Sequence, residues 1–169
     1  VELSDKDDVC IILKLFPNAS LSKDIGALMA TRAEHGPVLE IINTTEISDG
    51  YLKYLYEQSD SVVLPSRAEG YGLPMAEALK FGKPLITTGY SGHMYFCDEE
   101  NSFLIDYQLV PSQSHLNVIG AKVAEPNQQS LQKMMRYVFE NLDSQEVKRK
   151  IDAGKLTTTN LTWDRSAIA

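Results

Sequence analysis

The most constraining feature of this 169-residue sequence is the alternation of short apolar segments with segments of helical periodicity. A short run rich in Val, Ile and Leu is typical of a strand covered on both faces of a parallel sheet. Helices between such strands give right-handed βαβ units. The chain is therefore predicted to be an α/β protein with a Rossmann-like parallel sheet flanked by helices. Strands are predicted at 9–13, 38–42, 61–64, 84–88 and 102–105.

The predicted helices lie between and after these strands. Each has apolar residues at helical spacing, and most begin at a residue that can cap a helix or occupy its first turn. Helices are predicted at 21–29, after Ser48 or Asp49, from Pro74 to Gly82, from Asn127 to Leu142 and at 144–153.

Two further predictions concern the organisation of the chain. Residues 106–126 show no clear periodicity, so we expect an irregular segment there. No interior linker rich in Pro, Gly or Ser divides the sequence, so residues 1–169 are predicted to form a single Rossmann-like domain.

The charge balance excludes several function classes. The chain has 16 Lys and Arg against 23 Asp and Glu, which gives a net charge of −7. An acidic chain is a poor candidate for sequence-independent nucleic-acid binding or for an anionic membrane surface. No apolar run approaches the roughly 18 residues that a membrane-spanning helix needs. We therefore expect no nucleic-acid partner and no transmembrane segment.

The segment whose residues are best suited to bind a ligand runs from a strand through a glycine-rich loop into a helix. Gly70 and Gly72 allow unusual backbone angles and close approach to a ligand. The amides of Met75 and Ala76, at the start of the helix, are expected to have no intrahelical acceptor and to form an anion site suited to a diphosphate. Turns of this kind also occur in α/β proteins that bind no ligand there.

Two glutamates flank this turn. Glu69 lies in the loop and Glu77 in the first turns of the helix. Carboxylates are good acceptors for the vicinal hydroxyls of a sugar or ribose. The alternative for Glu77 is a simple interaction with the helix dipole. A glycosidase is disfavoured because its two carboxyl groups flank one glycosidic bond, whereas here an anion site separates them.

The whole segment resembles the E-x7-E signature of the retaining GT-B glycosyltransferases of family 4, also called glycosyl transferases group 1. The resemblance is good over residues 38–105. The matching residues are Pro65, Ser66, Glu69, Gly70, Tyr71, Gly72, Leu73, Pro74, Glu77, Ala78, Gly82, Lys83 and Pro84, with weaker matches at Ser91-Gly92, at 101–104 and at 161–164.

The resemblance implies that the chain is the C-terminal half of a GT-B fold, which binds the nucleotide-sugar donor. It implies a role for each matching residue. Glu69 is the candidate catalytic residue and contacts the donor sugar. Glu77 binds the ribose, and Asn43 and Thr44 are weaker candidates for nucleotide contacts. The sugar and diphosphate are lined by Gly70, Tyr71, Gly72, Leu73, Ser91 and Gly92.

The implied reaction moves a hexose-type sugar from a nucleotide-diphosphate sugar to a saccharide or lipid-linked acceptor. The acceptor attacks the front face, and the departing diphosphate takes its proton. No metal and no cofactor are expected. Polysaccharide biosynthesis is a typical setting. The expected location is cytoplasmic, with peripheral attachment to the inner membrane as an option for the full-length protein.

The resemblance also implies parts that we do not find in this sequence. The family carries an Arg and a Lys on a preceding strand–helix unit and binds its acceptor on an N-terminal domain. We expect both to lie outside this chain, which should then be inactive by itself. The alternatives are a non-catalytic sugar-nucleotide-binding or interaction module of the same fold, and another GT-B enzyme such as a sugar-nucleotide epimerase.

Overall fold

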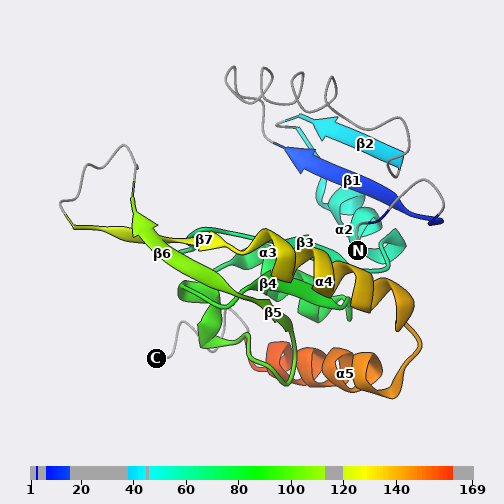
Figure 1. Ribbon diagram of the computed structural model, residues 1–169. Helices are drawn as coiled ribbons and strands as arrows, with labels where there is room; N and C mark the ends of the chain where they lie inside the picture. The colour runs from blue at the N-terminus through cyan, green and yellow to red at the C-terminus, as the bar shows by residue number, and fades with distance from the viewer. Residues whose placement is uncertain (1–2, 4–6, 16–37, 45, 113–119, 162–169) are drawn as a thin grey trace. The chain divides into compact units, whose positions relative to one another are not determined.

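The computed structural model describes residues 3, 7–15, 38–44, 46–112 and 120–161 (Figure 1). The helix predicted at 21–29 lies outside the described residues. The chain divides into two compact units, residues 1–54 and residues 55–169, and each is described by itself. The single-domain assignment for residues 1–169 stays a prediction.

The first unit contains a pair of parallel strands. β1 (Cys10–Leu15) pairs with β2 (Val38–Asn43) over their whole length, which confirms both predicted strands. Ile12 is 42% exposed, so the burial on both faces that its apolar sequence predicts is not found in β1. The following helix, α2 (Asp49–Gln58), crosses the boundary, and its residues from Leu55 onward belong to the second unit. Its cap is Ser48, whose Oγ accepts a hydrogen bond of 3.2 Å from the Tyr51 amide.

The second unit is built on a three-stranded parallel sheet. Its strands are β3 (Val62–Leu64), β4 (Leu85–Thr88) and β5 (Phe103–Ile105), in the order β3-β4-β5. All four residues of β4, the central strand, are buried. The prediction of an α/β fold with a parallel sheet is thereby confirmed.

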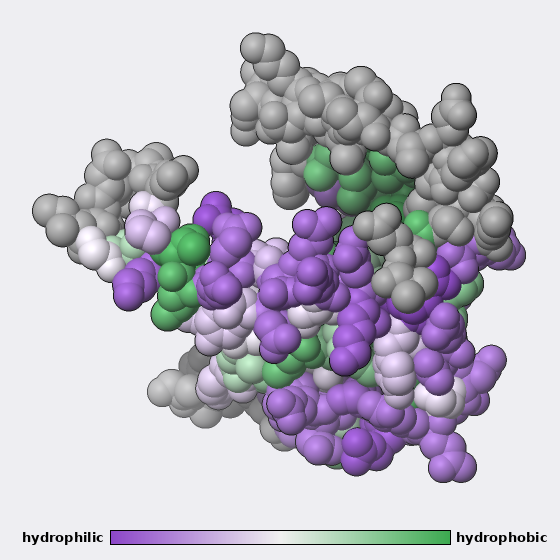
Figure 2. Space-filling view, in the orientation of Figure 1, coloured by the Kyte–Doolittle hydropathy of each residue, from purple (hydrophilic) through white to green (hydrophobic). Residues whose placement is uncertain are grey.

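Helices cover both faces of this sheet. Successive residues of a strand point to opposite faces, so two neighbours in β4 show which helix lies on each face. Leu85 packs in a core cluster with residues of α3 (Leu73–Lys80), whereas its neighbour Ile86 packs in a second cluster with residues of α4 (Gln128–Glu140). The last helix, α5 (Gln145–Thr159), extends beyond the predicted range. The outward faces of α4 and α5 are mainly hydrophilic (Figure 2).

The last two helices both begin at a residue whose side chain caps the helix. The side chain of Asn127 accepts a hydrogen bond of 2.8 Å from the Ser130 amide, as predicted for the start of α4. Ser144 accepts one of 3.2 Å from Val147 at the start of α5. Among the described residues, no helix is long and apolar enough to cross a membrane.

The prediction of an irregular segment at 106–126 is wrong. β6 (Tyr107–Pro111) and β7 (Lys122–Pro126) form an antiparallel hairpin, with residues 113–119 outside the described part. Most side chains of both strands are exposed or half-buried, including Leu109 at 49%, and hydrophobic surface shows on the hairpin in Figure 2. A hairpin with so few buried positions has no strong apolar alternation, which is why the sequence does not predict its strands.

Candidate functional site

The loops after β3 and β4 are hydrogen-bonded to each other at Glu69. These strands are parallel neighbours, so their carboxyl ends lie at the same edge of the sheet, where ligands bind in such folds. Ser91 Oγ accepts from the Glu69 amide at 2.9 Å and donates to the Glu69 carbonyl at 2.7 Å. The Gly92 amide donates to the same carbonyl at 3.1 Å. The structure thus brings together three predicted site residues.

The backbone of this loop contact tolerates little change. A β-carbon at Gly92 would lie 2.0 Å from the Gly70 carbonyl oxygen. Ser91 has φ 90° and ψ −162°, a conformation that is strained for any residue except glycine. The two hydrogen bonds of its hydroxyl offset part of that strain.

The carboxyl group of Glu69 is held by a hydroxyl. Ser66 Oγ donates to Glu69 Oε1 at 2.7 Å, and Glu69 is half-buried. Ser66 lies near the end of β3 and so fixes the carboxylate relative to the sheet. The other carboxylate oxygen remains able to accept from a ligand hydroxyl.

Gly72 begins α3 in the left-handed conformation, with φ 90° and ψ 55°. A β-carbon there would lie 2.7 Å from the β-carbon of His93. His93 is fully buried, and its Nε2 lies 2.7 Å from the Thr88 carbonyl, which can only accept. Nε2 therefore carries the proton. The buried His93 side chain therefore packs directly against Gly72.

The prediction that the amides of Met75 and Ala76 lack an intrahelical acceptor is wrong. Both donate to the Gly72 carbonyl, at 3.0 and 3.2 Å. With the left-handed angles of Gly72, its carbonyl serves as the first acceptor of the helix. The helix therefore begins at Leu73, one residue earlier than predicted. Pro74 has no N–H, and the described part of the chain offers the Leu73 amide no acceptor. The amide left for an anion at this end of α3 is that of Leu73.

Glu77 is half-buried on α3 and contacts a residue that the sequence did not single out for function. Tyr56 Oη donates to Glu77 Oε2 at 3.0 Å. Burial raises the pKa of Tyr56 well above its ordinary value of 10.0, and the Glu77 carboxylate raises that pKa further. The helical spacing of the sequence places Tyr56 on an inward face, but it does not show which polar group the Tyr56 hydroxyl will reach.

The remaining predicted residues are placed less tightly. Tyr71 is 39% exposed, and its ring contacts that of Phe96 at 5.0 Å; Leu73 is 54% exposed. Asn43 and Thr44 belong to the first unit, where the Thr44 hydroxyl accepts from the Glu46 amide at 3.1 Å. Their nucleotide contacts stay a prediction.

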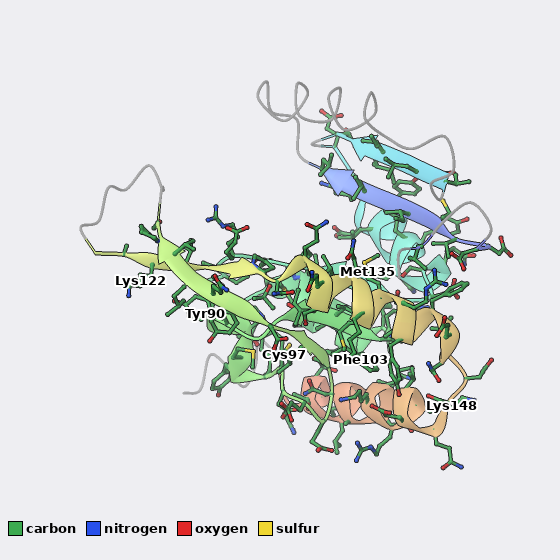
Figure 3. All side chains as sticks on the ribbon, in the orientation of Figure 1. Tyr90, Cys97, Phe103, Lys122, Met135 and Lys148 are labelled. Atoms are coloured by element: carbon green, nitrogen blue, oxygen red, sulfur yellow. The ribbon has the colours of Figure 1, made fainter. Side chains whose placement is uncertain are left out.

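The β6–β7 hairpin borders the two loops. The Ala124 amide donates to the Arg67 carbonyl at 2.9 Å, and the Arg67 guanidinium pairs with Glu125 at 2.8 Å. Tyr90, in the loop after β4, contacts Tyr107 with ring centroids 5.2 Å apart; Figure 3 shows Tyr90 beside the hairpin. The segment expected to be irregular therefore forms one side of the candidate site.

Within the described residues, no group of three or more His, Cys, Asp or Glu side chains could hold a metal ion.

The family model described as glycosyl transferases group 1 matches residues 33–153, well over half of the chain. The chain belongs to this family. The match includes both glutamates and both loops of the site.

Solved structures resemble the chain in fold. The crystal structure of the GtfA/B complex matches with a TM-score of 0.56 and 17% identity over 92% of this chain. That of the pneumococcal O-GlcNAc transferase GtfA in complex with UDP and GlcNAc matches with a TM-score of 0.50 and 19% identity over 89%. The chain spans about a quarter of their length, 27% and 26%. No curated protein matches it in sequence.

Proposed function

We propose that the chain is the donor-binding, C-terminal domain of a retaining, metal-independent GT-B glycosyltransferase of family 4. It binds a nucleotide-diphosphate sugar, from which a hexose-type sugar passes to a saccharide or lipid-linked acceptor. The acceptor is held by an N-terminal domain in the full-length protein, which acts in the cytoplasm in polysaccharide biosynthesis. Family membership and the UDP and GlcNAc held by a similar structure support the donor class.

The observation that carries this proposal is the contact between the two loops at Glu69. The Glu69 backbone binds Ser91 and Gly92, and its carboxylate accepts from Ser66. A carboxylate fixed in this way can accept hydroxyls of a donor sugar in one orientation. Rigid placement of polar groups around the reacting centre is how an enzyme lowers a barrier without covalent chemistry.

In this proposal the diphosphate binds at the start of α3. The Leu73 amide lies at the positive end of α3 and has no acceptor among the described residues. The exposed Gly70 has no atom within 4 Å of a β-carbon position, so the backbone there is open to a ligand. The diphosphate, as leaving group, takes the acceptor proton. In the same complex, the Glu77 carboxylate accepts hydrogen bonds from the ribose hydroxyls.

The test is calorimetric titration of the 169-residue chain with UDP, GDP, ADP and their sugar conjugates, each with EDTA and with Mg²⁺. We expect binding that selects one base, is equal in EDTA and Mg²⁺, and weakens at least tenfold in Glu77→Gln. Glu100→Gln is the control, because it makes the same charge change at an exposed ion pair with Arg149. Equal binding by Glu77→Gln would contradict the proposal. If the 169-residue chain does not bind at millimolar ligand, the same titration is made with the full-length protein, which also carries the expected Arg and Lys, and absence of binding there would contradict the proposal.

The retaining outcome needs a protein that also binds the acceptor. Proton NMR of the product from the full-length enzyme should show the same anomeric configuration as the donor. An inverted anomer would contradict this part of the proposal, and Glu69→Gln should lower turnover more than donor affinity.

A further inference from the structure

Tyr56 and Glu77 form a polar contact between α2 and α3 that the assigned site roles do not include. Tyr56 Oη lies 3.0 Å from Glu77 Oε2 and 3.3 Å from the Pro74 carbonyl. A phenol has one proton, and the ionised carboxylate is the stronger acceptor and the nearer one. The Tyr56 hydroxyl therefore donates mainly to Glu77.

The Tyr56 side chain is itself held firmly. Its ring stacks on Phe81, with centroids 5.1 Å apart and planes within 9°, and it packs on the core cluster around α3. Its carbonyl accepts from Ser59 Oγ at 3.0 Å, and the next carbonyl, that of Glu57, accepts from Lys83 Nζ at 3.0 Å. The hydroxyl thus occupies one position relative to α3.

The Tyr56 hydroxyl also keeps its proton. Burial raises the pKa of Tyr56, and the charge of Glu77 and the hydrogen bond to it raise that pKa further. The phenol is therefore a hydrogen-bond donor throughout the pH range in which the protein is expected to work. Oε2 of Glu77 is occupied by it, whereas the described residues offer Oε1 no partner.

We propose that Tyr56 is a positioning residue for Glu77, which fixes the carboxylate so that it accepts the 2′- and 3′-hydroxyls of a ribose. This inference rests on the proposed function. A glutamate side chain has three rotatable bonds, and ordering them on ligand binding costs free energy. The Tyr56 hydroxyl orders them before the ligand arrives. Ser66 holds Glu69 by the same kind of contact.

The experiment compares two ligands in one variant. The probes are whichever of UDP, GDP and ADP binds the chain most tightly, and its 2′,3′-dideoxy analogue. Tyr56→Phe removes one oxygen and keeps the ring that stacks on Phe81. We expect it to weaken ribonucleotide binding about 10-fold, the lower end of the loss seen when a residue that orients a metal-ligating side chain is removed. The dideoxy analogue should bind Tyr56→Phe and the unchanged chain equally.

The control is Tyr137→Phe, which breaks a tyrosine–glutamate hydrogen bond of 2.5 Å between α4 and α5. It should change the affinity of neither ligand. Equal weakening of both ligands by Tyr56→Phe would mean a structural role only and would overturn the inference, as would no weakening of either. Thermal unfolding of each variant shows whether the fold is kept.

Glu77→Gln separates the two proposals. If Glu77→Gln weakens the ribonucleotide and Tyr56→Phe does not, the positioning role fails and the proposed function stands. If Glu77→Gln has no effect, both fail.

Discussion

Gly92 lies so close to Gly70 that a β-carbon at position 92 would stand 2.0 Å from the Gly70 carbonyl oxygen. The facing atoms belong to the backbone, and the Gly92 amide donates to the adjacent carbonyl of Glu69. The loops after β3 and β4 can therefore not separate at this point without losing the contact that fixes Glu69.

Gly92→Ala is expected to lower the free energy of unfolding by about 3 kcal/mol, at the upper end of the usual cost of overpacking, because no flexible side chain can move aside. Urea denaturation measures it. Gly50→Ala is the matched control, since its β-carbon would meet only Ser48 Oγ at 4.0 Å. Equal stability of Gly92→Ala and the unchanged chain would contradict the described loop contact.

Gly70→Ala should separate binding from folding. A β-carbon at Gly70 meets nothing within 4 Å, so the free energy of unfolding should change by less than about 1 kcal/mol. If the backbone here approaches a diphosphate, the added methyl group should lower nucleotide-sugar affinity about tenfold, or ~1.4 kcal/mol. Calorimetric titration measures the affinity. Unchanged affinity would remove Gly70 from the binding surface.

Ser91 allows backbone strain and hydrogen bonding to be measured separately. Ser91→Ala loses both hydroxyl contacts with Glu69 and keeps the strained φ of 90°, so we expect a loss of about 1–3 kcal/mol. Ser91→Gly loses the same contacts but adopts that φ without strain, so it should be more stable than Ser91→Ala by roughly 1 kcal/mol. Chemical denaturation of both variants gives the difference. The reverse order would show that Ser91 is not strained.

Lys150 is a buried lysine whose ammonium group has backbone partners. Its Nζ donates to the carbonyls of Glu99 and Ser102, the latter at 3.1 Å, and lies 5.0 Å from the centre of the Phe103 ring. Lys150→Met keeps most of the alkyl chain and removes these interactions. It should lower the free energy of unfolding by about 2 kcal/mol, because the carbonyl of the buried Ser102 and that of Glu99 lose this donor.

Lys148→Met provides the comparison on the same helix. Lys148 is exposed and pairs with Asp143 at 3.4 Å, and pairs of this kind contribute about 0–1 kcal/mol. In thermal or urea unfolding, Lys150→Met should therefore be clearly less stable than Lys148→Met. Equal effects would argue against a structural role of the Lys150 ammonium.

Cys97 should make stability fall at alkaline pH. Burial raises the pKa of the Cys97 thiol from 9.0 to about 11, with Asp98 adding to the rise and a hydrogen bond with Ser102 opposing it. The folded state therefore favours the protonated thiol. This contribution to stability is complete below pH 9 and is lost as the pH rises from 9 toward 11. The fall should be smaller in Cys97→Ala, as measured by urea denaturation across that range.

Thiol labelling gives a second measurement. Cys10 is exposed and should react quickly with a thiol reagent at pH 8, whereas Cys97 should react only when the second unit opens. Rapid labelling of both cysteines in the folded chain would contradict the burial of Cys97.

The local patterns of the sequence determined the main elements. The apolar runs predicted all five strands of the parallel sheets, and Ser48, Asn127 and Gly82 marked helix ends correctly because capping depends on the residues next to a helix end. The segment from Pro65 to Pro84 was sufficient to predict the family. In each case the signal lies within a few residues of what it predicts.

Tertiary structure alone decided what depends on contacts between distant segments. The β6–β7 hairpin is anchored through Ala124 and Arg67, 57 positions apart in number (124 minus 67), and has too few buried positions to show a pattern. The partners of the two glutamates could not be predicted either. Tyr56 reaches Glu77 across 21 positions, and Ser91 reaches Glu69 across 22. Periodicity shows which face of a helix is buried, but the packing of separate segments determines which polar groups meet.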